Sequence, residues 1–419
     1  MTRTRIVVAV VVATLVVAAL GLIPVARAAD PIKVGLGMAL TGGLSANGKP
    51  ALLAMQIWKD EVNKKGGLLG RPVEIIFYDD QTNPSTVPGI YTKLLDVDKV
   101  DLVVSGYGTN LIAPLMPIAI ERKLTLMGIF GLANNEKYQY PNYFQISPTG
   151  PDPATSTAIP FFELAAKQTP KPQTVAIVGA DAEYPQTALV GAREVIKRFG
   201  FKTVYDKTYP PSTVDYTPIV RAIKATNPDI VFIASYPPDS VGMLRAAHEV
   251  GLQPKIMGGG MVGLQFTTIM QSMGSKLNGL VNYDYWVPEK TMMFPGIAEF
   301  FREYQPRATK EGVDTLGYYL PPYAYAAMQV LGQAIEATKG LDQQKIADYI
   351  RTNEFNTIVG KVRFGKNGEW AKGRTLMVQY QKVQDGNIEQ FRQPGKKPVL
   401  YPEELKSGNI IYPYSAALK

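Results

Sequence analysis

The residue types that usually carry catalysis or bind metals are scarce in this chain. It has no cysteine and one histidine, His248. A serine–histidine–acid triad would have to use His248, which falls in a predicted helix at 239–250, so a place on a helix surface is the better interpretation. Gly35 and Gly37 hint at a dinucleotide fingerprint, but Leu40 stands where its third glycine would be. A zinc site would need carboxylates alone, which is unusual. We therefore expect no metal, no cofactor and no enzymatic activity.

Short segments rich in glycine and hydroxyl side chains are better candidates for a site. They follow predicted strands at 41–43, 105–110, 128–131 and 258–260. The first two precede a predicted helix, where free backbone N–H groups point toward an incoming anion, and Thr109 could add a hydroxyl donor. Any one of these loops alone could be an ordinary strand–helix turn. Together they indicate a site for a small anion.

Aromatic residues at the ends of predicted elements form a second group of candidates. A tyrosine in a cleft supplies apolar area and a polar hydroxyl at low entropic cost. Each of them taken alone could serve equally well in surface or hinge packing. The residues concerned are Tyr184, Tyr236, Tyr283, Tyr285, Trp286, Tyr318 and Tyr319.

Composition and charge favour a globular protein that handles small molecules. The chain has 419 residues, 46% of them hydrophobic and 19% charged, and this length suits two domains. Its net charge is +8, but lysines and arginines stand singly or in pairs, without the clustered stripe that phosphate backbones require. We therefore expect no nucleic-acid partner. A mild positive field would favour anionic ligands.

The first 28 residues are typical of a secretory signal peptide. Arg3 and Arg5 are followed by an apolar run at 6–25, and Ala26-Arg27-Ala28 offers small residues for cleavage near Ala28. A retained transmembrane helix is the alternative, because the run is long enough to span a bilayer. Without a cysteine the chain has no residue to lipidate and no disulfide. We therefore predict a soluble periplasmic protein.

The rest of the chain alternates apolar strands with amphipathic helices, which predicts an α/β fold of parallel sheets covered on both faces. In such sheets ligands bind at the carboxyl ends of the strands. The pattern runs once through the first half and restarts near residue 174, so two successive α/β units are expected. Strands are predicted at 32–38, 73–78, 101–105, 124–129, 174–179, 203–208, 229–235, 255–257 and 279–281, and a terminal hairpin at 361–365 with 376–382. Helices are predicted at 51–62, 84–95, 111–122, 185–199, 216–225, 239–250, 321–338 and 343–351.

Over nearly all of its length after residue 28, the chain resembles periplasmic solute-binding proteins of the leucine/isoleucine/valine-binding type, which serve ABC importers. The resemblance depends on the order and spacing of short segments that are weak individually. They are Ile-Lys-Val-Gly at 32–35, Leu-Thr-Gly at 40–42, Asn-Lys-Lys-Gly-Gly at 63–67, Gly-Arg-Pro-Val at 70–73, Tyr-Asp-Asp at 78–80, Asp-Tyr-Thr at 215–217, Asn-Pro-Asp at 227–229, Met-Leu-Arg-Ala-Ala at 243–247 and Gly-Lys-Val-Arg-Phe at 360–364.

This resemblance implies a type I periplasmic binding protein: two doubly wound parallel-sheet lobes joined by three crossovers, closing over a ligand in the cleft. The crossovers are placed near residues 145–146, 282 and 357. The expected division is 1–28 signal peptide, 29–145 and 283–356 lobe 1, and 146–282 and 357–419 lobe 2. A monomer and partnership with an inner-membrane ABC permease and its ATPases are also implied.

The resemblance also places a ligand site on this chain. The loop that grips the ligand carboxylate corresponds to Gly108, Thr109 and Asn110, and the next strand end to Gly131 and its two successors. The complete expected set is Asn47, Tyr107, Gly108, Thr109, Asn110, Gly131, Leu132, Ala133, Tyr184, Tyr236, Gly260 and Met261.

One departure from the family pattern bears on the ligand. Amino-acid receptors of this type hold the ligand ammonium with an acid in a Met-Gly-x-Glu-Gly segment, where this chain has Gly260. A buried ammonium without a counter-charge costs several kcal/mol, so an α-amino acid is disfavoured unless Asp284, Asp181 or Glu183 substitutes. Gly260 should also open volume. We therefore expect a small carboxylate with an aromatic or apolar body. A branched-chain or other amino acid for the same importer class, and a ligand-sensing module for a membrane receptor, remain as alternatives.

Overall fold

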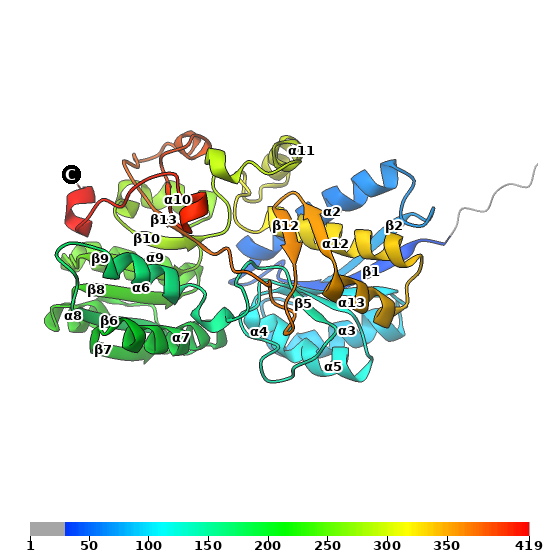
Figure 1. Cartoon of the computed structure of the whole chain (residues 1–419), viewed down its shortest axis with the longest axis horizontal. Helices are drawn as coiled ribbons and strands as arrows, with labels where there is room; N and C mark the ends of the chain where they lie inside the picture. Colours follow the sequence, from blue (N-terminus) through cyan, green and yellow to red (C-terminus); the bar gives the residue numbers. More distant parts are fainter. Residues whose placement is uncertain (1–29, 419) are drawn as a thin grey trace, which may run out of the picture.

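The computed structural model describes residues 30–418, which form two α/β lobes side by side (Figure 1). The signal-peptide prediction lies outside the described residues. Among the described helices, none combines the length and apolar character needed to cross a membrane. The central strands of both sheets are apolar and buried on both faces, as parallel sheets covered by helices require; all six residues of β8, for example, are buried, whereas the edge strand β7 is mostly exposed.

Lobe 1 is built on a parallel five-stranded sheet in the order β2-β1-β3-β4-β5. Helices α2 and α12 pack together on one face, and α3, α4 and α5 lie on the other (Figure 1). The strands are β1 (Ile32–Met38), β2 (Val73–Asp79), β3 (Leu102–Tyr107), β4 (Leu126–Ile129) and β5 (Tyr143–Gln145). The helices are α2 (Ser45–Lys64), α3 (Val87–Asp96), α4 (Thr109–Ile112), α5 (Met116–Glu121), α12 (Pro321–Thr338) and α13 (Gln343–Thr352).

Lobe 2 is built on a seven-stranded sheet in the order β14-β13-β10-β9-β8-β6-β7, in which β13 and β14 run antiparallel to their neighbours. The strands are β6 (Thr174–Ala180), β7 (Lys202–Tyr209), β8 (Ile230–Ser235), β9 (Ile256–Met261), β10 (Val281–Asp284), β13 (Leu376–Gln379) and β14 (Val399–Tyr401). The helices are α6 (Ala158–Ala166), α7 (Glu183–Phe199), α8 (Thr217–Ala225), α9 (Pro237–Val250) and α10 (Thr267–Met273).

Helix ends in both lobes follow local sequence signals. Helix α9 begins with Pro237, whose fixed φ suits the first helical position, and it ends at Gly251 with φ +66°. Helix α7 likewise ends at Gly200 with φ +71°. Helix α2 begins at Ser45, before the predicted start at residue 51, because its first turn packs into the lobe; Asn47 there is fully buried.

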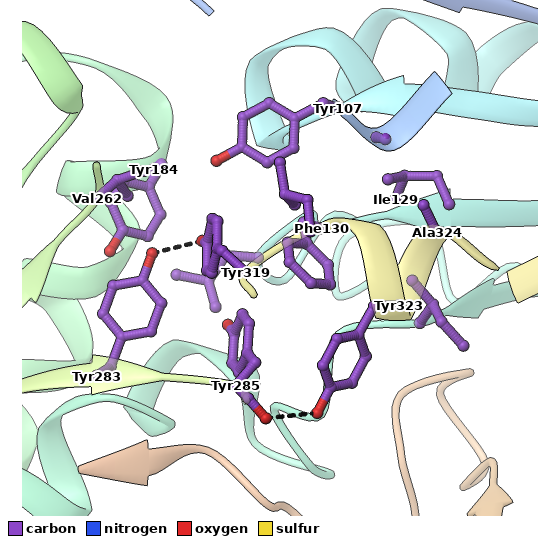
Figure 2. Close-up of a cluster of buried hydrophobic side chains, with 14 of the residues drawn as sticks. Tyr107, Ile129, Phe130, Tyr184, Val262, Tyr283, Tyr285, Tyr319, Tyr323 and Ala324 are labelled. Carbon is purple, nitrogen blue, oxygen red and sulfur yellow. Dashed lines mark hydrogen bonds between the residues drawn. The ribbon is translucent and has the colours of Figure 1, made fainter. Parts of the chain in front are cut away.

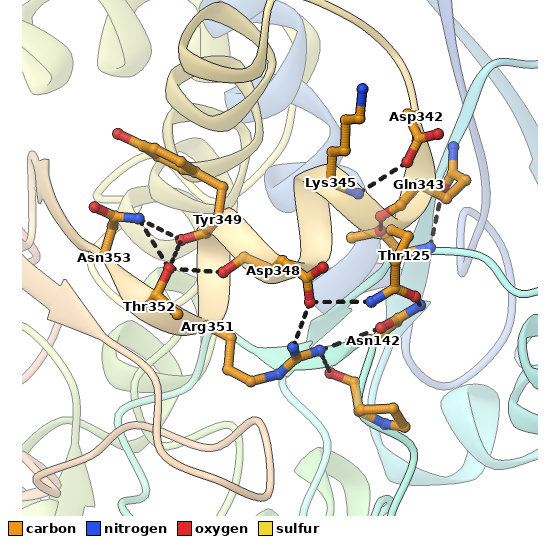
Figure 3. A network of polar contacts seen from close by, with 12 residues as sticks. Thr125, Asn142, Asp342, Gln343, Lys345, Asp348, Tyr349, Arg351, Thr352 and Asn353 are labelled. Carbon is orange, nitrogen blue, oxygen red and sulfur yellow. Dashed lines mark hydrogen bonds and ion pairs between the residues drawn. The ribbon is translucent and has the colours of Figure 1, made fainter.

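The chain returns to lobe 1 after β10, and side-chain hydrogen bonds fasten the returning helices there. Figure 3 shows contacts of α13, in which the side chain of Gln343 accepts from the backbone N–H of Thr125 at 2.8 Å. The same side chain donates to the carbonyl of Asp101 at 2.9 Å. At the other end of α13, Arg351 donates to the carbonyl of Pro141 at 2.7 Å.

Two of the predicted lobe boundaries fall within hydrogen-bonded strands. The boundary after residue 282 cuts β10, all four residues of which pair with β13. The boundary after 356 cuts β11 (Glu354–Thr357), which pairs with β12 (Gly360–Arg363). The predicted hairpin of 361–365 with 376–382 is therefore wrong: β12 turns back on β11 through two residues, and β13 lies in the lobe 2 sheet between β10 and β14. Helix α11 (Ile297–Glu311), which no prediction covered, contacts α2 through Arg307 and Asp60 at 2.9 Å.

Candidate ligand-binding site

In each sheet the strand order reverses at one point, and a crevice forms there at the carboxyl ends of the adjoining strands. In lobe 1 the reversal lies between β1 and β3, and in lobe 2 between β8 and β6. Tyr107 is the last residue of β3. Tyr184 lies in the first turn of α7, which follows β6, and Tyr236 directly follows β8. All three tyrosines line a tightly packed cavity between the lobes, with about 30 Å³ of free space.

We call this space the interlobe cavity. Its walls combine glycine, hydroxyl and aromatic groups from both lobes and from the crossing segments. They are Tyr107, Gly108, Thr109, Phe130, Gly131, Leu132, Ser147, Thr157, Tyr184, Tyr236, Val262, Tyr283, Tyr285 and Tyr319.

The lobe 1 wall is a rigid pair of loops that follow β3 and β4. Gly108 has φ +95°, a conformation that glycine adopts without strain, and it starts α4 at Thr109. The Thr109 Oγ1 accepts a hydrogen bond from the backbone N–H of Leu132 at 3.0 Å, and Asn134 donates to the Thr109 carbonyl at 3.0 Å. Because its oxygen accepts from Leu132, the hydroxyl of Thr109 keeps its proton free to donate. This wall can therefore bind an anion with a neutral donor.

The lobe 2 wall is formed by Tyr184 and Tyr236, whose ring centroids are 5.5 Å apart. The Tyr184 hydroxyl donates to the carbonyl of Gly260 at 2.9 Å. A Cβ added at Gly260 would stand 3.2 Å from that same hydroxyl. The volume expected from the missing side chain at Gly260 is therefore not open, because Tyr184 occupies it.

An aromatic cluster fills the region between the two walls (Figure 2). The Tyr283 and Tyr319 hydroxyls share a hydrogen bond of 2.6 Å, and the rings of Tyr285 and Tyr319 stack at 5.6 Å with 6° between their planes. The Phe130 ring meets Tyr285 edge-on at 4.9 Å. Phe130 has φ +56°, which is uncommon for a bulky side chain and requires support from its surroundings. This cluster offers flat apolar surface to a ligand ring.

The interlobe cavity is uncharged. Among the residues described by the structure, those lining the cavity include no aspartate, glutamate, lysine, arginine or histidine. Burial raises the pKa of the Tyr283, Tyr285 and Tyr319 hydroxyls well above the usual 10, so they stay neutral donors at ordinary pH. Asp284, which follows Tyr283 in the chain, is fully buried and pairs with Lys397 at 2.6 Å.

The two lobes touch at the mouth of the cavity. The Tyr236 hydroxyl of lobe 2 donates to the Asn110 Oδ1 of lobe 1 at 3.1 Å, and α4 lies against α7. The structure is therefore closed over the cavity.

The expected site residues divide into two groups. Tyr107, Gly108, Thr109, Gly131, Leu132, Tyr184 and Tyr236 line the cavity. Asn110 closes its mouth, while Asn47, Ala133, Gly260 and Met261 lie outside its lining. Asn47 is fully buried and neither of its side-chain polar atoms has a hydrogen-bond partner.

Seven lining residues were absent from the expected set. The sequence distinguishes Tyr283, Tyr285 and Tyr319 only as tyrosines at the ends of predicted elements. Trp286 and Tyr318, from the same aromatic group, pack on each other at 4.8 Å and lie outside the lining. The remaining four are Phe130, Ser147, Thr157 and Val262. Phe130 and Val262 directly adjoin expected positions, whereas Ser147 and Thr157 carry no local signal in the sequence.

The metal-ligating side-chain types and the one histidine of the chain can be placed in the structure. No group of three or more histidine, cysteine, aspartate or glutamate side chains there could hold a metal ion. The Nε2 of His248 is 2.8 Å from the carbonyl of Lys276, in the last turn of α9, at the opposite end of this helix from Tyr236.

Comparison with known proteins agrees with this architecture. A family model described as periplasmic binding protein matches residues 31–387. A protein of Brucella abortus (strain 2308) called Leu/Ile/Val-binding protein homolog 8 is 24% identical over 382 residues, which cover 89% of this chain and 91% of that protein.

Two solved structures share the fold. A leucine-binding protein from Thermotoga maritima MSB8 superposes with a TM-score of 0.71 at 19% identity, covering 84% of this chain and 99% of that one. An ABC transporter solute-binding protein from R. palustris, in complex with 4-hydroxybenzoate, superposes with a TM-score of 0.73 at 20% identity, covering 85% and 95%. Because the family model spans most of the sequence, the chain belongs to the periplasmic binding protein family, with the leucine/isoleucine/valine-binding proteins among its relatives.

Proposed function

We propose that this protein captures a small carboxylate with an aromatic or apolar body in the interlobe cavity and delivers it to an ABC importer from the periplasm. The observation that carries the proposal is the uncharged, tyrosine-rich lining of the cavity. A ring of roughly 150–200 Å² buried there would contribute about 4–5 kcal/mol. Hydrogen bonds from Thr109 and neighbouring donors to the carboxylate would add about 1.5–3 kcal/mol each.

The surroundings of the cavity argue against an α-amino acid as the main ligand. An ammonium group needs a carboxylate beside it, and Gly260 supplies none. Of the possible substitutes, Asp284 is already neutralised by Lys397, and Asp181 and Glu183 are exposed outside the lining. The names of the Brucella relative and of the Thermotoga protein keep an amino acid as the competing ligand, while the ligand of the R. palustris protein favours an aromatic carboxylate.

Matched ligand pairs that differ only in the ammonium group test the proposal. We would screen the purified protein, lacking residues 1–28, by thermal shift against 3-phenylpropanoate and phenylalanine, and against 4-methylpentanoate and leucine, with benzoates alongside. A ligand at 100 times its dissociation constant stabilises the fold by about 2.7 kcal/mol. The carboxylates without ammonium should bind at least about tenfold more tightly. Stabilisation by the amino acids alone would contradict the ligand class and leave the binding role intact.

Substitution of Gly260 tests the placement of the site. In Gly260→Glu the new Cβ would lie 3.2 Å from the Tyr184 hydroxyl, so the added carboxylate would stand near the cavity wall. Like-charge repulsion should then weaken the binding of a carboxylate ligand at least about tenfold. Gly260→Gln has the same size without the charge and separates repulsion from crowding. Calorimetric titration of both variants gives the comparison. Unchanged affinity in Gly260→Glu would show that the ligand binds elsewhere.

A further inference from the structure

A buried hydroxyl without a partner lies on the lobe 2 side of the interlobe cavity. Thr157 lines the cavity, its exposed fraction is 3%, and its Oγ1 has no hydrogen-bond partner. Leaving a buried hydroxyl unpaired costs about 1–3 kcal/mol, so such a group in a binding cavity calls for a partner supplied by the ligand. No part of the proposed carboxylate site uses it.

Thr157 also lies at the start of a helix. Thr157 is the N-cap residue of the nine-residue helix α6, and its side chain makes no capping hydrogen bond. The first amides of a helix have no partner within the helix, and the helix dipole favours an electron-rich atom at that end. Ser147, from the segment that crosses between the lobes, lines the cavity as well.

We propose that Thr157 and the first turn of α6 form a second polar subsite, which binds a hydroxyl substituent on the ring of the carboxylate ligand. The inference rests on the proposed function, in which Thr109 of lobe 1 binds the carboxylate. Because Thr109 and Thr157 belong to opposite lobes, a ligand with oxygen atoms at both ends contacts both lobes at once. Such a ligand would favour the closed state more than unsubstituted benzoate does.

A hydroxyl fits this subsite better than a second carboxylate. It can accept a hydrogen bond from an amide of α6 and donate one to Thr157 Oγ1, which satisfies both groups. A second full charge would enter a cavity whose lining has no lysine or arginine within the described residues, at the desolvation cost of an unpaired ion. The subsite therefore selects hydroxybenzoates over benzoate and over benzenedicarboxylates.

The test is the ratio of the hydroxybenzoate affinity to the benzoate affinity, measured by calorimetric titration of the purified protein with benzoate and with 2-, 3- and 4-hydroxybenzoate. The native protein should prefer at least one hydroxybenzoate by about 5- to 10-fold, the value of one neutral hydrogen bond. Thr157→Val keeps the side-chain shape and should reduce that ratio to about one. Thr157→Ser should retain the preference.

Ser156→Ala is the matched control. The Ser156 Oγ is also buried without a partner, but Ser156 lies outside the lining of the interlobe cavity and should leave the ratio unchanged. The subsite is overturned if the affinity ratio is near one in the native protein, or if Thr157→Val does not lower it. In either case, binding of benzoate would still support the proposed function. If neither benzoate nor any hydroxybenzoate binds, the proposed aromatic ligand fails and the subsite fails with it.

Discussion

The interlobe cavity and the layer of side chains behind it handle charge in opposite ways. The cavity is lined by neutral groups, chiefly tyrosines whose pKa values are raised by burial. Immediately behind it lie ionisable side chains that are as deeply buried: the Asp284–Lys397 pair, with exposed fractions of 0% and 3%, and Glu369 at 1%. Each of these charges is either paired or suppressed by protonation.

This contrast shows how a neutral site can be selective for an anion. An unpaired buried carboxylate next to Tyr285 would repel the carboxylate of a ligand, and an unpaired lysine would attract any anion regardless of shape. Because the buried carboxylate and the buried lysine neutralise each other behind the cavity wall, the affinity for a ligand depends on hydrogen bonds and on the fit of its ring. Disturbing that cancellation should affect both stability and ligand binding.

The largest effect is expected from Lys397→Met. This substitution leaves Asp284 buried without its partner, and breaking a buried ion pair in this way costs about 3–5 kcal/mol. Urea denaturation should show the loss, and benzoate binding should weaken as well because Asp284 lies beside Tyr285. The double variant Lys397→Met/Asp284→Asn removes both charges and should recover most of the stability. Equal losses in the single and double variants would mean that packing of Lys397, and not its charge, matters.

A pH-dependent effect of the opposite sign is expected from Glu369→Gln. Burial raises the pKa of Glu369 from 4.5 to about 8, and its Oε2 accepts a hydrogen bond from Thr149 at 2.9 Å between two crossing segments. Since the unfolded state ionises near 4.5 and the folded state near 8, unfolding releases a proton in this window and native stability falls as pH rises. The variant lacks this slope and should be more stable at pH 8 by on the order of 4 kcal/mol.

Denaturation midpoints measured from pH 4.5 to pH 8.5 would check this expectation. The midpoints of the native protein and of Glu369→Gln should agree near pH 4.5. The difference between them should grow steadily up to pH 8 and then level off. Glu121→Gln, which removes an exposed carboxyl, should follow the native profile. Parallel profiles for the native protein and Glu369→Gln would mean that Glu369 is ionised in the folded state.

Most strands and helices of both lobes could be predicted because their local pattern is strong. Helix α9, for example, has a proline at its start and a glycine at its end, and β1 is a short apolar run before a glycine-rich loop. Helix α6 was missed because it has no polar face to reveal its period: Pro160, Phe161 and Phe162 are all buried in it. The partner of β13 was also missed, because β10 lies about a hundred residues earlier and nothing local specifies it.

The parts of the candidate site that lie at the carboxyl ends of strands could be predicted from the sequence. The parts formed by segments distant in the chain could not. The loop at Gly108 follows β3, which borders the strand reversal, and the loop at Gly131 follows the next strand, β4, so their positions could be inferred from the chain. Tyr319 joins Tyr283 and Tyr285 only through tertiary packing. The volume expected at Gly260 was wrong for a related reason: the ring that fills it comes from a helix seventy-six residues earlier.

The smallest effect is expected at the contact that joins the two walls across the mouth. Tyr236→Phe removes one neutral hydrogen bond, of 3.1 Å, to Asn110, worth about 0.5–1.5 kcal/mol, so ligand affinity should fall about 2- to 10-fold. Because the bond exists only when the lobes touch, the loss should appear mainly as faster dissociation in stopped-flow measurements. Asn110→Ala should have a similar effect, and the double variant should be little worse than either single one, since both remove the same bond. Fully additive losses would place Tyr236 and Asn110 on the ligand separately and not on each other.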